Sequence, residues 1–277
     1  MAWSIAPEAA RRNGLAMTYC VGMVIDDGFV MMSDTRTNSG VDNISVFSKM
    51  FRWSNPGERI IALMTAGNLA TTQAVISKLE QRDREPAGRR NALLELPTMF
   101  QVAAEAGRLL RETVRETQDG NGQQGKGRFT ASMIVGGQIA GMEPRLFLIY
   151  PEGNFIEANI DTPFFQIGET KYGRPILLRG YDRTMGFADA AKLLMVSFDS
   201  TLRANLSVGL PLDLLMVRRD EYEPLHECRI EHGDPYFTAV SSGWSGALLD
   251  AFHSLPGYPF PAEDSKGNTH NFGIPKQ

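Results

Sequence analysis

The sequence predicts an α+β protein in which two antiparallel sheets pack between layers of helices, an αββα sandwich. Three observations support this prediction. Segments of strand character alternate with pairs of helical segments, in the order strands, two helices, strands, two helices, strands. The connections between the first strands are too short for the crossovers that parallel strands require. The chain has 277 residues, which is enough to bury one large core.

Four strands are expected in the first 65 residues. Residues 18–25 form an apolar run with β-branched side chains, and a turn signal at 26–28 precedes a partner strand at 29–33. Two further strands are predicted at 49–53 and 59–65, on either side of the turn Asn55-Pro56-Gly57. Residues 36–45 are polar and are predicted to form a loop. Because the connections are short, we expect these strands to form one antiparallel sheet.

Helices and strands alternate after residue 67. Residues 68–84 place their apolar side chains on one stripe of a helix, and a second helix is predicted for about 97–117. The later patterns predict strands at 129–135, 145–150, 154–158 and 164–167, helices at 170–178 and 186–205, a strand at 212–218, and a further candidate strand at 236–241. We expect one domain over 18–254, followed by an extended tail at 255–277 that is rich in Pro and Gly.

The composition argues against several classes of function. The net charge is −4 and the chain has no long block of Lys and Arg, so a nucleic-acid partner is not expected. No apolar run approaches the ~18 residues of a membrane helix, and residues 1–16 lack the apolar core of a secretory signal. Cys20 and Cys228 are too few for a disulfide framework. We therefore expect a cytoplasmic protein without a membrane partner.

The most informative position is Thr18, which directly follows Met17 at the start of the first predicted strand. A threonine hydroxyl is a poor nucleophile at neutral pH and needs a base beside it. If the chain began at Thr18, its α-amino group, with an unperturbed pKa of about 7.7–8.0, would be that base. Residues 1–17 would then be an N-terminal extension, either a propeptide or the product of an upstream start. Taken alone, Thr18 is more simply read as an ordinary strand threonine.

Four short motifs together resemble the proteasome β-type subunits. They are Thr18-Tyr19-Cys20, the block from Ser33-Asp34-Thr35-Arg36 to Asp42, Lys49-Met50-Phe51 and Ala66-Gly67-Asn68. Over about residues 18–260 the chain is most similar to the bacterial Anbu (ancestral β-subunit) branch, which is related to the HslV peptidase. This resemblance implies the N-terminal-nucleophile hydrolase fold, threonine peptidase chemistry, a cytoplasmic location, and self-assembly into a ring or an open helical turn.

The resemblance also implies roles for single residues. Thr18 would be the nucleophile, and its hydroxyl proton would pass to the freed amine directly or through one water. Lys49 would keep the site electropositive, and Asp34 would hold Lys49 charged and oriented. The backbone N–H of Gly67 would stabilise the oxyanion, and Arg36 would brace Asp34.

Two motifs differ from the pattern of the proteasome subunits. Where those subunits carry Gly-Ser-Gly, with a serine near the threonine amine, this chain has Gly168-Glu169-Thr170. Their Arg-Asp-x-x-Ser-Gly motif resembles residues 203–209 only loosely, because Ser207 is a candidate for the serine but the acid is missing. We expect Glu169 either to lie by the amine and raise its pKa, or to point into solvent at the start of a helix.

Three functions remain open on the sequence alone. The first is a threonine peptidase that acts on peptides or unfolded polypeptide inside a homo-oligomer. The second is a narrow amidohydrolase with the same chemistry, and the third is a catalytically silent assembly protein. The sequence does not indicate whether a dedicated unfoldase docks. No cofactor and no metal are expected, and a metal site at His226, Cys228 and His232 is the weaker alternative because no fourth ligand is evident.

Overall fold

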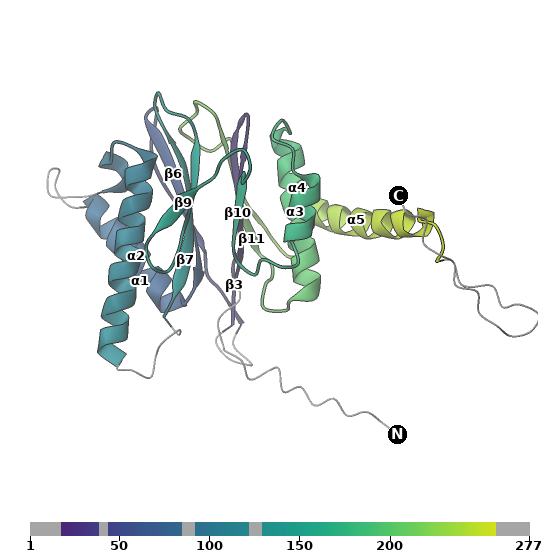
Figure 1. The fold of residues 1–277 in the computed structure, drawn as a ribbon, viewed down its shortest axis with the longest axis horizontal. Helices are drawn as coiled ribbons and strands as arrows, with labels where there is room; N and C mark the ends of the chain where they lie inside the picture. The colour runs from purple at the N-terminus through teal and green to yellow at the C-terminus, as the bar shows by residue number, and fades with distance from the viewer. Residues whose placement is uncertain (1–17, 39–43, 85–91, 122–128, 259–277) are drawn as a thin grey trace, which may run out of the picture.

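The computed structural model describes residues 18–38, 44–84, 92–121 and 129–258. Its elements form four layers, in which two five-stranded sheets lie face to face (Figure 1). Helices α1 (Leu69–Arg84) and α2 (Met99–Asn121) lie on one side of the sheets, and α3 (Arg174–Gly180) and α4 (Phe187–Ala204) lie on the other. The predicted αββα architecture is confirmed. Across the described ranges, no helix has the length and apolar character needed to span a membrane. The segments 1–17 and 259–277 lie outside the described residues, so the domain boundaries stay predictions.

The first sheet fixes the start of the described chain. Its strand order is β10-β1-β2-β11-β12, and every neighbouring pair is antiparallel. The strands are β1 (Tyr19–Ile25), β2 (Gly28–Asp34), β10 (Phe164–Gly168), β11 (Leu212–Arg218) and β12 (His226–Ile230). In the register, Tyr19 pairs with Gly168 and Cys20 pairs with Ser33. Because β1 is bonded on both edges, residue 18 is held in a defined place just before it.

The second sheet has the order β5-β6-β7-β8-β9. Its strands are β5 (Met50–Asn55), β6 (Arg59–Gly67), β7 (Ala131–Ile139), β8 (Arg145–Ile149) and β9 (Phe155–Glu157). The expectation of one sheet for the first four strands was wrong, since β1 and β2 belong to one sheet and β5 and β6 to the other. The expected loop at 36–45 was also wrong in part. The ends of this segment pair as β3 (Arg36–Asn38) and β4 (Ile44–Val46) in a small antiparallel ribbon. In sequence, this ribbon follows β2 of the first sheet and precedes β5 of the second.

The described helices include four, α1 to α4, that cover the outer faces of the sheets, and α5, which runs outward from α4. They are α1 (Leu69–Arg84), the short 3-10 helix η2 (Leu93–Glu95), α2 (Met99–Asn121), α3 (Arg174–Gly180), α4 (Phe187–Ala204) and α5 (Pro235–Ser254). The candidate strand at 236–241 was wrong, because these residues belong to α5. Asp234 caps this helix by accepting a hydrogen bond from the N–H of Phe237 at 2.7 Å, and Pro235 suits the first helical turn. The helix predicted at 170–178 begins later, at Arg174.

The core has three parts, one between each pair of adjacent layers. Side chains alternate along β1, so that Tyr19, Val21 and Met23 face α3 and α4 while Cys20 faces the second sheet. A third cluster joins the second sheet to α1 and α2. Both faces of each sheet are therefore buried in the body of the molecule, which explains the nearly continuous apolar runs in the central strands.

Candidate active site

Thr18 lies immediately before β1 and is 3% exposed. Two backbone contacts hold it in place. The N–H of Tyr19 donates to Oδ1 of Asp34 at 3.0 Å, and the carbonyl oxygen of Thr18 accepts from the N–H of Glu169 at 2.6 Å. The first contact comes from the end of β2 and the second from the residue that follows β10. The sheet thus positions the threonine by its backbone and leaves its side chain facing a small cavity.

Lys49 and Asp34 form a buried ion pair beside Thr18. The Nζ of Lys49 lies 2.7 Å from Oδ1 of Asp34 and also donates to the carbonyl oxygen of Arg36 at 2.7 Å. Burial raises the pKa of Asp34 to about 6, and the charge of Lys49 with its hydrogen bond, together with the N–H of Tyr19, opposes that rise. Asp34 is therefore ionised at neutral pH, and it holds the ammonium group of Lys49 in one orientation.

Arg36 contacts this pair through its backbone. Its carbonyl oxygen accepts from Lys49, whereas its side chain lies against Gly209, where a Cβ would come within 2.7 Å of the Arg36 Cδ. Within the described residues the guanidinium forms no ion pair with Asp34. The resemblance suggested that the side chain of Arg36 braces Asp34. In the structure, Arg36 instead contacts Lys49 through its backbone carbonyl oxygen.

Gly67 ends β6 at the edge of the small cavity. Its φ of +118° and the 2.4 Å that would separate a Cβ from the carbonyl oxygen of Thr130 both require glycine at this position. The cavity has a volume of about 10 Å³, close to the size of one water molecule. Its lining brings together the predicted residues Thr18, Lys49 and Gly67 with Thr37, Thr65, Ala66, Leu69 and Thr72.

Glu169 is buried next to Thr18. Its side chain does not reach solvent, since the residue is 5% exposed and its carboxylate accepts from the N–H of Lys171 at 2.9 Å and from Nδ2 of Asn205 at 3.1 Å. The expected alternative, a solvent-facing Glu169 at a helix start, was therefore wrong, because α3 begins only at Arg174. The chain reaches this place through Gly168, whose φ is +82° and where a Cβ would lie 1.9 Å from the carbonyl oxygen of Thr18.

Asn205 links the two supporting residues that the sequence suggested. Its Nδ2 donates to Glu169, and its Oδ1 accepts from the N–H of Ser207 at 3.0 Å. Ser207 is half-buried in the turn after α4 and reaches this network through its backbone. The sequence comparison pointed to this segment only as a place where an acid is missing. In this segment the structure has the side-chain amide of Asn205, which donates to the carboxylate of Glu169 on the neighbouring loop.

A hydrogen-bonded network around Tyr19 was not foreseen from the sequence. The Oη of Tyr19 lies 2.7 Å from Oγ of Ser197 on α4 and accepts from Nε2 of Gln166 on β10 at 2.7 Å. Ser197 in turn bonds the carbonyl oxygen of Gly173 at 3.0 Å. Burial raises the pKa of Tyr19 to about 12, so its hydroxyl stays protonated. This network fixes the residue that follows Thr18, and its partners are too distant in sequence to leave a local pattern.

The weaker alternative of a metal site has no geometric counterpart in the part of the chain that the structure describes. His226 and Cys228 lie on β12, and His232 follows it. Among the described residues, no three side chains of His, Cys, Asp or Glu come close enough together to hold a metal ion.

Comparisons with known proteins match this chain to one family. A family model described as "Proteasome subunit" matches residues 17–209. Three solved structures cover 87% of this chain and 98–100% of their own, each with a TM-score of 0.81. They are an Anbu (Gly-1) mutant from Hyphomicrobium sp. strain MC1 at 46% identity, Anbu (ancestral beta-subunit) from Yersinia bercovieri at 42%, and the helical assembly of the Anbu complex from Pseudomonas aeruginosa at 44%. Among curated proteins, none matches the chain.

Proposed function

Because the chain belongs to the proteasome family and, within it, to the Anbu (ancestral β-subunit) proteins, we propose that it is a threonine peptidase with Thr18 as nucleophile. The class that this membership indicates is an N-terminal-nucleophile hydrolase. The observation that carries the proposal is the buried Lys49–Asp34 ion pair next to Thr18, at a cavity that Gly67 also lines.

The reaction begins at the Thr18 hydroxyl. Its oxygen attacks the carbonyl carbon of the scissile peptide bond, and its proton passes to the α-amino group of Thr18, directly or through one water. When the C–N bond breaks, the leaving amine takes this proton from the Thr18 ammonium group and departs, so that the α-amino group is neutral again. The ester formed on Thr18 is then hydrolysed by water, which releases the acid product and restores the hydroxyl.

The surrounding groups favour each charged species on this path. The ammonium of Lys49 stabilises negative charge that develops on the Thr18 oxygen, and Asp34 holds that ammonium in place. The N–H of Gly67 is the proposed donor to the oxyanion of the tetrahedral intermediate. Such donors work best when they are fixed before the reaction, and the strand β6 provides that rigidity.

The mechanism needs a free amine at Thr18, so the working chain begins there. An amide at this nitrogen would not be basic. The match to the family model starts at Met17, which supports a start close to Thr18. Met17 is then either the true initiator, removed before the small threonine, or part of a propeptide that is lost by autolysis.

The substrate is a peptide or unfolded polypeptide, and the enzyme works in the cytoplasm as a homo-oligomer. The relative from Pseudomonas aeruginosa is described as a helical assembly, which supports an open helical form over isolated subunits for this chain. No cofactor takes part. The second candidate function is a narrow amidohydrolase, which would use the same nucleophile on one specific amide.

Three variants and a substrate panel test this function. Thr18→Ala and Lys49→Ala should each remove nearly all hydrolysis, because the two residues act as one unit, whereas Thr18→Ser should keep part of it. Hydrolysis of a panel of fluorogenic peptides and simple amides is the measurement. Cleavage of many peptides supports the peptidase, and cleavage of one amide alone supports the amidohydrolase. If Lys49→Ala stays within a few-fold of the wild type, the proposed role of Lys49 is wrong. If the chain that begins at Thr18 hydrolyses none of these substrates, the function that remains is that of a catalytically silent assembly protein.

A further inference from the structure

The loop that joins β10 to α3 contacts Thr18 at its first residue. This loop comprises residues 169–173, between the end of β10 at Gly168 and the start of α3 at Arg174. The N–H of Glu169 donates to the carbonyl oxygen of Thr18 at 2.6 Å. The position of Thr18 therefore depends on how this loop is held.

The last residue of the same loop contacts Tyr19. The carbonyl oxygen of Gly173 accepts from Oγ of Ser197 at 3.0 Å, and that Oγ lies 2.7 Å from Oη of Tyr19. The fit is close, because a Cβ on Gly173 would lie 2.2 Å from Oη of Tyr19 and 2.4 Å from Oγ of Ser197. The two ends of the loop thus contact two consecutive residues of the chain, the backbone of Thr18 and the side chain of Tyr19.

The hydrogen bonds around Tyr19 run in one direction. Each hydroxyl has a single hydrogen, and Ser197 donates its hydrogen to Gly173, so Tyr19 donates the bond between the two hydroxyls. The Oη of Tyr19 accepts in turn from Nε2 of Gln166 at 2.7 Å. Burial raises the pKa of Tyr19 to about 12, so its hydrogen is present at neutral and mildly alkaline pH. The network is therefore one chain of hydrogen bonds from β10 through β1 and α4 to the loop, and loss of either hydroxyl interrupts it.

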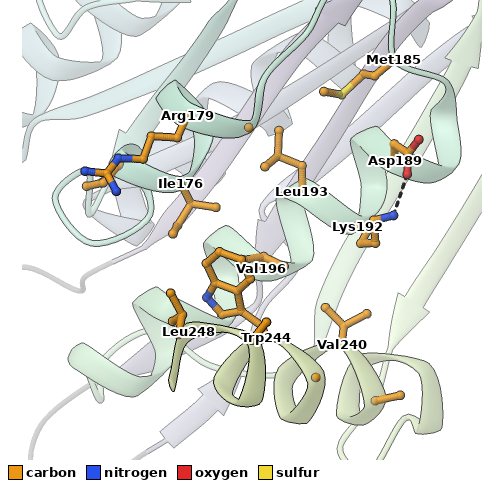
Figure 2. Close-up of a pocket in the computed structure, with 15 residues that line it drawn as sticks. Ile176, Arg179, Met185, Asp189, Lys192, Leu193, Val196, Val240, Trp244 and Leu248 are labelled. Atoms are coloured by element: carbon orange, nitrogen blue, oxygen red, sulfur yellow. Dashed lines mark hydrogen bonds and ion pairs between the residues drawn. The ribbon is translucent and has the colours of Figure 1, made fainter. Parts of the chain in front are cut away.

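The outer side of α3 offers this end of the loop little support. Figure 2 shows Ile176 of α3 and Val196 of α4 on the walls of a hollow of about 800 Å³ between α3, α4 and α5. Pro175, the second residue after the loop, lines the same hollow. On the inner side, Tyr19 and Ser197 are fully buried. Buried polar groups that lose a partner do not find water in its place, so the two hydroxyls are the polar link between this end of the loop and β1.

We propose that Tyr19 and Ser197 are positioning residues for the hydrolysis at Thr18. Their hydroxyls hold the far end of loop 169–173, and the loop keeps the N–H of Glu169 on the carbonyl oxygen of Thr18. Neither side chain touches the reacting atoms. Without the two hydroxyls the loop moves and takes the backbone of Thr18 with it, so that the attacking oxygen loses its alignment. A displacement of about 1 Å is enough to slow a reaction strongly.

Tyr181 provides a matched control. Its Oη donates to the carbonyl oxygen of Val24 at 2.7 Å, near the other end of β1, and burial raises its pKa to about 12 as well. Tyr181 and Tyr19 pack in the same apolar cluster between the first sheet and the helices α3 and α4. Tyr19→Phe and Tyr181→Phe therefore each remove one hydroxyl from the same layer, but only Tyr19→Phe releases the loop.

The first experiment compares Tyr19→Phe, Ser197→Ala, their double variant and Tyr181→Phe in chains that begin at Thr18 and are otherwise complete. In steady-state hydrolysis of the peptide panel, Tyr19→Phe and Ser197→Ala should each lower kcat about tenfold or more and leave KM within about twofold. The double variant should be no slower than the slower single variant, because both changes break one chain of hydrogen bonds. Tyr181→Phe should keep kcat within about twofold of the wild type.

Circular dichroism verifies that each variant is folded. A folded Tyr19→Phe with the kcat of the wild type overturns the proposal. An equal loss of kcat in Tyr181→Phe also overturns it, because the effect would then follow the loss of any buried hydroxyl in this layer. Additive losses in the double variant would show that the two hydroxyls act separately, which contradicts the single chain of hydrogen bonds.

Hydrogen exchange tests the contact without a substrate. The amide hydrogen of Glu169 is bonded to Thr18, so its exchange rate reports whether the loop is held. Tyr19→Phe and Ser197→Ala should speed this exchange about tenfold or more, and Tyr181→Phe should leave it within about twofold of the wild type. An unchanged rate in a folded Tyr19→Phe overturns the proposal even if kcat falls. The role in hydrolysis rests on the proposed function. If the wild type hydrolyses nothing, that function is wrong, and the exchange rates alone decide whether the two hydroxyls position Thr18.

Discussion

At the scale of single residues, two opposing effects determine the charge of Asp34. Burial favours its neutral form, while the ammonium of Lys49 at 2.7 Å favours the carboxylate. The balance leaves the pKa of Asp34 at about 6, above its ordinary value. A raised pKa means that folding favours the protonated acid, so the ionised form that the site requires is lost as the pH falls through about 6.

This balance predicts the shape of the pH profile. The Thr18 amine must be neutral, so the logarithm of kcat/KM should fall with a slope of one as the pH drops below the pKa of that amine. Below about pH 6, protonation of Asp34 removes the partner of Lys49, and the slope should steepen to two. Steady-state kinetics from pH 5 to 9 measure it, with circular dichroism to verify folding. A slope that stays at one down to pH 5 would show that the charge of Asp34 is not needed.

Glu169 gives a second prediction at this scale. The prediction is that the carboxylate of Glu169, whose N–H bonds the Thr18 carbonyl oxygen, lies close enough to the Thr18 amine to favour its ammonium form, which raises the pKa of that amine and makes hydrolysis weak at neutral pH. Glu169→Ser and the shape-preserving Glu169→Gln should both move the midpoint of the profile to lower pH. Asn205→Ala removes a partner of the carboxylate without removing the charge, so it should not lower the midpoint.

The control for this series is Glu152→Gln, which neutralises an exposed carboxylate in the turn before β9. It should leave the midpoint where it is. Identical midpoints for the wild type, Glu169→Ser and Glu169→Gln would remove Glu169 from the site. A shift in all variants, including Glu152→Gln, would mean that the profile follows the net charge and not this position.

The sequence predicted the residues of the site that belong to short motifs. Thr18, Asp34, Lys49 and Gly67 each lie in such a motif, and the structure brings them together at one cavity or ion pair. Asn205 could not be assigned a role, because its contact with Glu169 joins a turn after α4 to a loop 36 residues earlier. A contact between two segments with no shared periodicity leaves no trace in a single sequence.

At the scale of elements, the junction between β10 and the loop that follows it determines the position of Thr18. Gly168 pairs with Tyr19 and adopts a left-handed φ of +82° against the carbonyl oxygen of Thr18. A side chain at this position would push the start of β1 away from the Lys49–Asp34 pair. The conformation of a single glycine thus couples strand pairing to the geometry of the site.

Gly168→Ala should therefore cost both stability and hydrolysis. The left-handed backbone alone costs a residue with a Cβ about 1–2 kcal/mol, and the overlap with Thr18 adds to it. Gly141→Ala is the matched control, because Gly141 has a φ of +76° but no atom within 4 Å of a Cβ. Urea unfolding and peptide hydrolysis should show a small loss of stability and full activity for Gly141→Ala, and a larger loss of both for Gly168→Ala. Equal effects of the two substitutions would contradict the proposed coupling.

The errors in element prediction have identifiable causes. Residues 236–241 are rich in aromatic and β-branched side chains, as strands are, but Asp234 and Pro235 provide a helix start that outweighs this short pattern. The ribbon inside the loop expected at 36–45 was missed because β3 and β4 have only three residues each, too few to establish a periodic pattern. Long helical stripes such as α1, α2 and α4 were predicted well, since many apolar positions define each of them.

At the scale of the whole molecule, the order of elements was sufficient to predict four layers. It was not sufficient to divide the strands between sheets. The strands β1, β2 and β6 are buried on both faces, so their sequences carry no sign of which sheet they join. The same limit applies to α5, whose apolar residues Leu248, Leu249 and Phe252 are exposed in the described structure, which their sequence does not indicate.

The layered fold also explains why the reaction depends on a single atom, the backbone nitrogen of Thr18. Asp34 ends β2, Lys49 directly precedes β5 and Gly67 ends β6, so the sheets position these groups. Thr18 is held by its own carbonyl oxygen and by the next N–H. The α-amino group is the one component that folding does not create. It exists only in a chain that begins at Thr18.

The most direct test compares two forms of the full protein that differ only at this point. One begins at Thr18, and the other retains Ala16-Met17 before it, with each N-terminus verified by intact mass. At pH 8 the first form should hydrolyse the peptide panel, and the second should be inactive although equally folded and assembled. Equal activity of the two forms, with Met17 still attached in the second, would contradict the assignment of the Thr18 amine as the catalytic base.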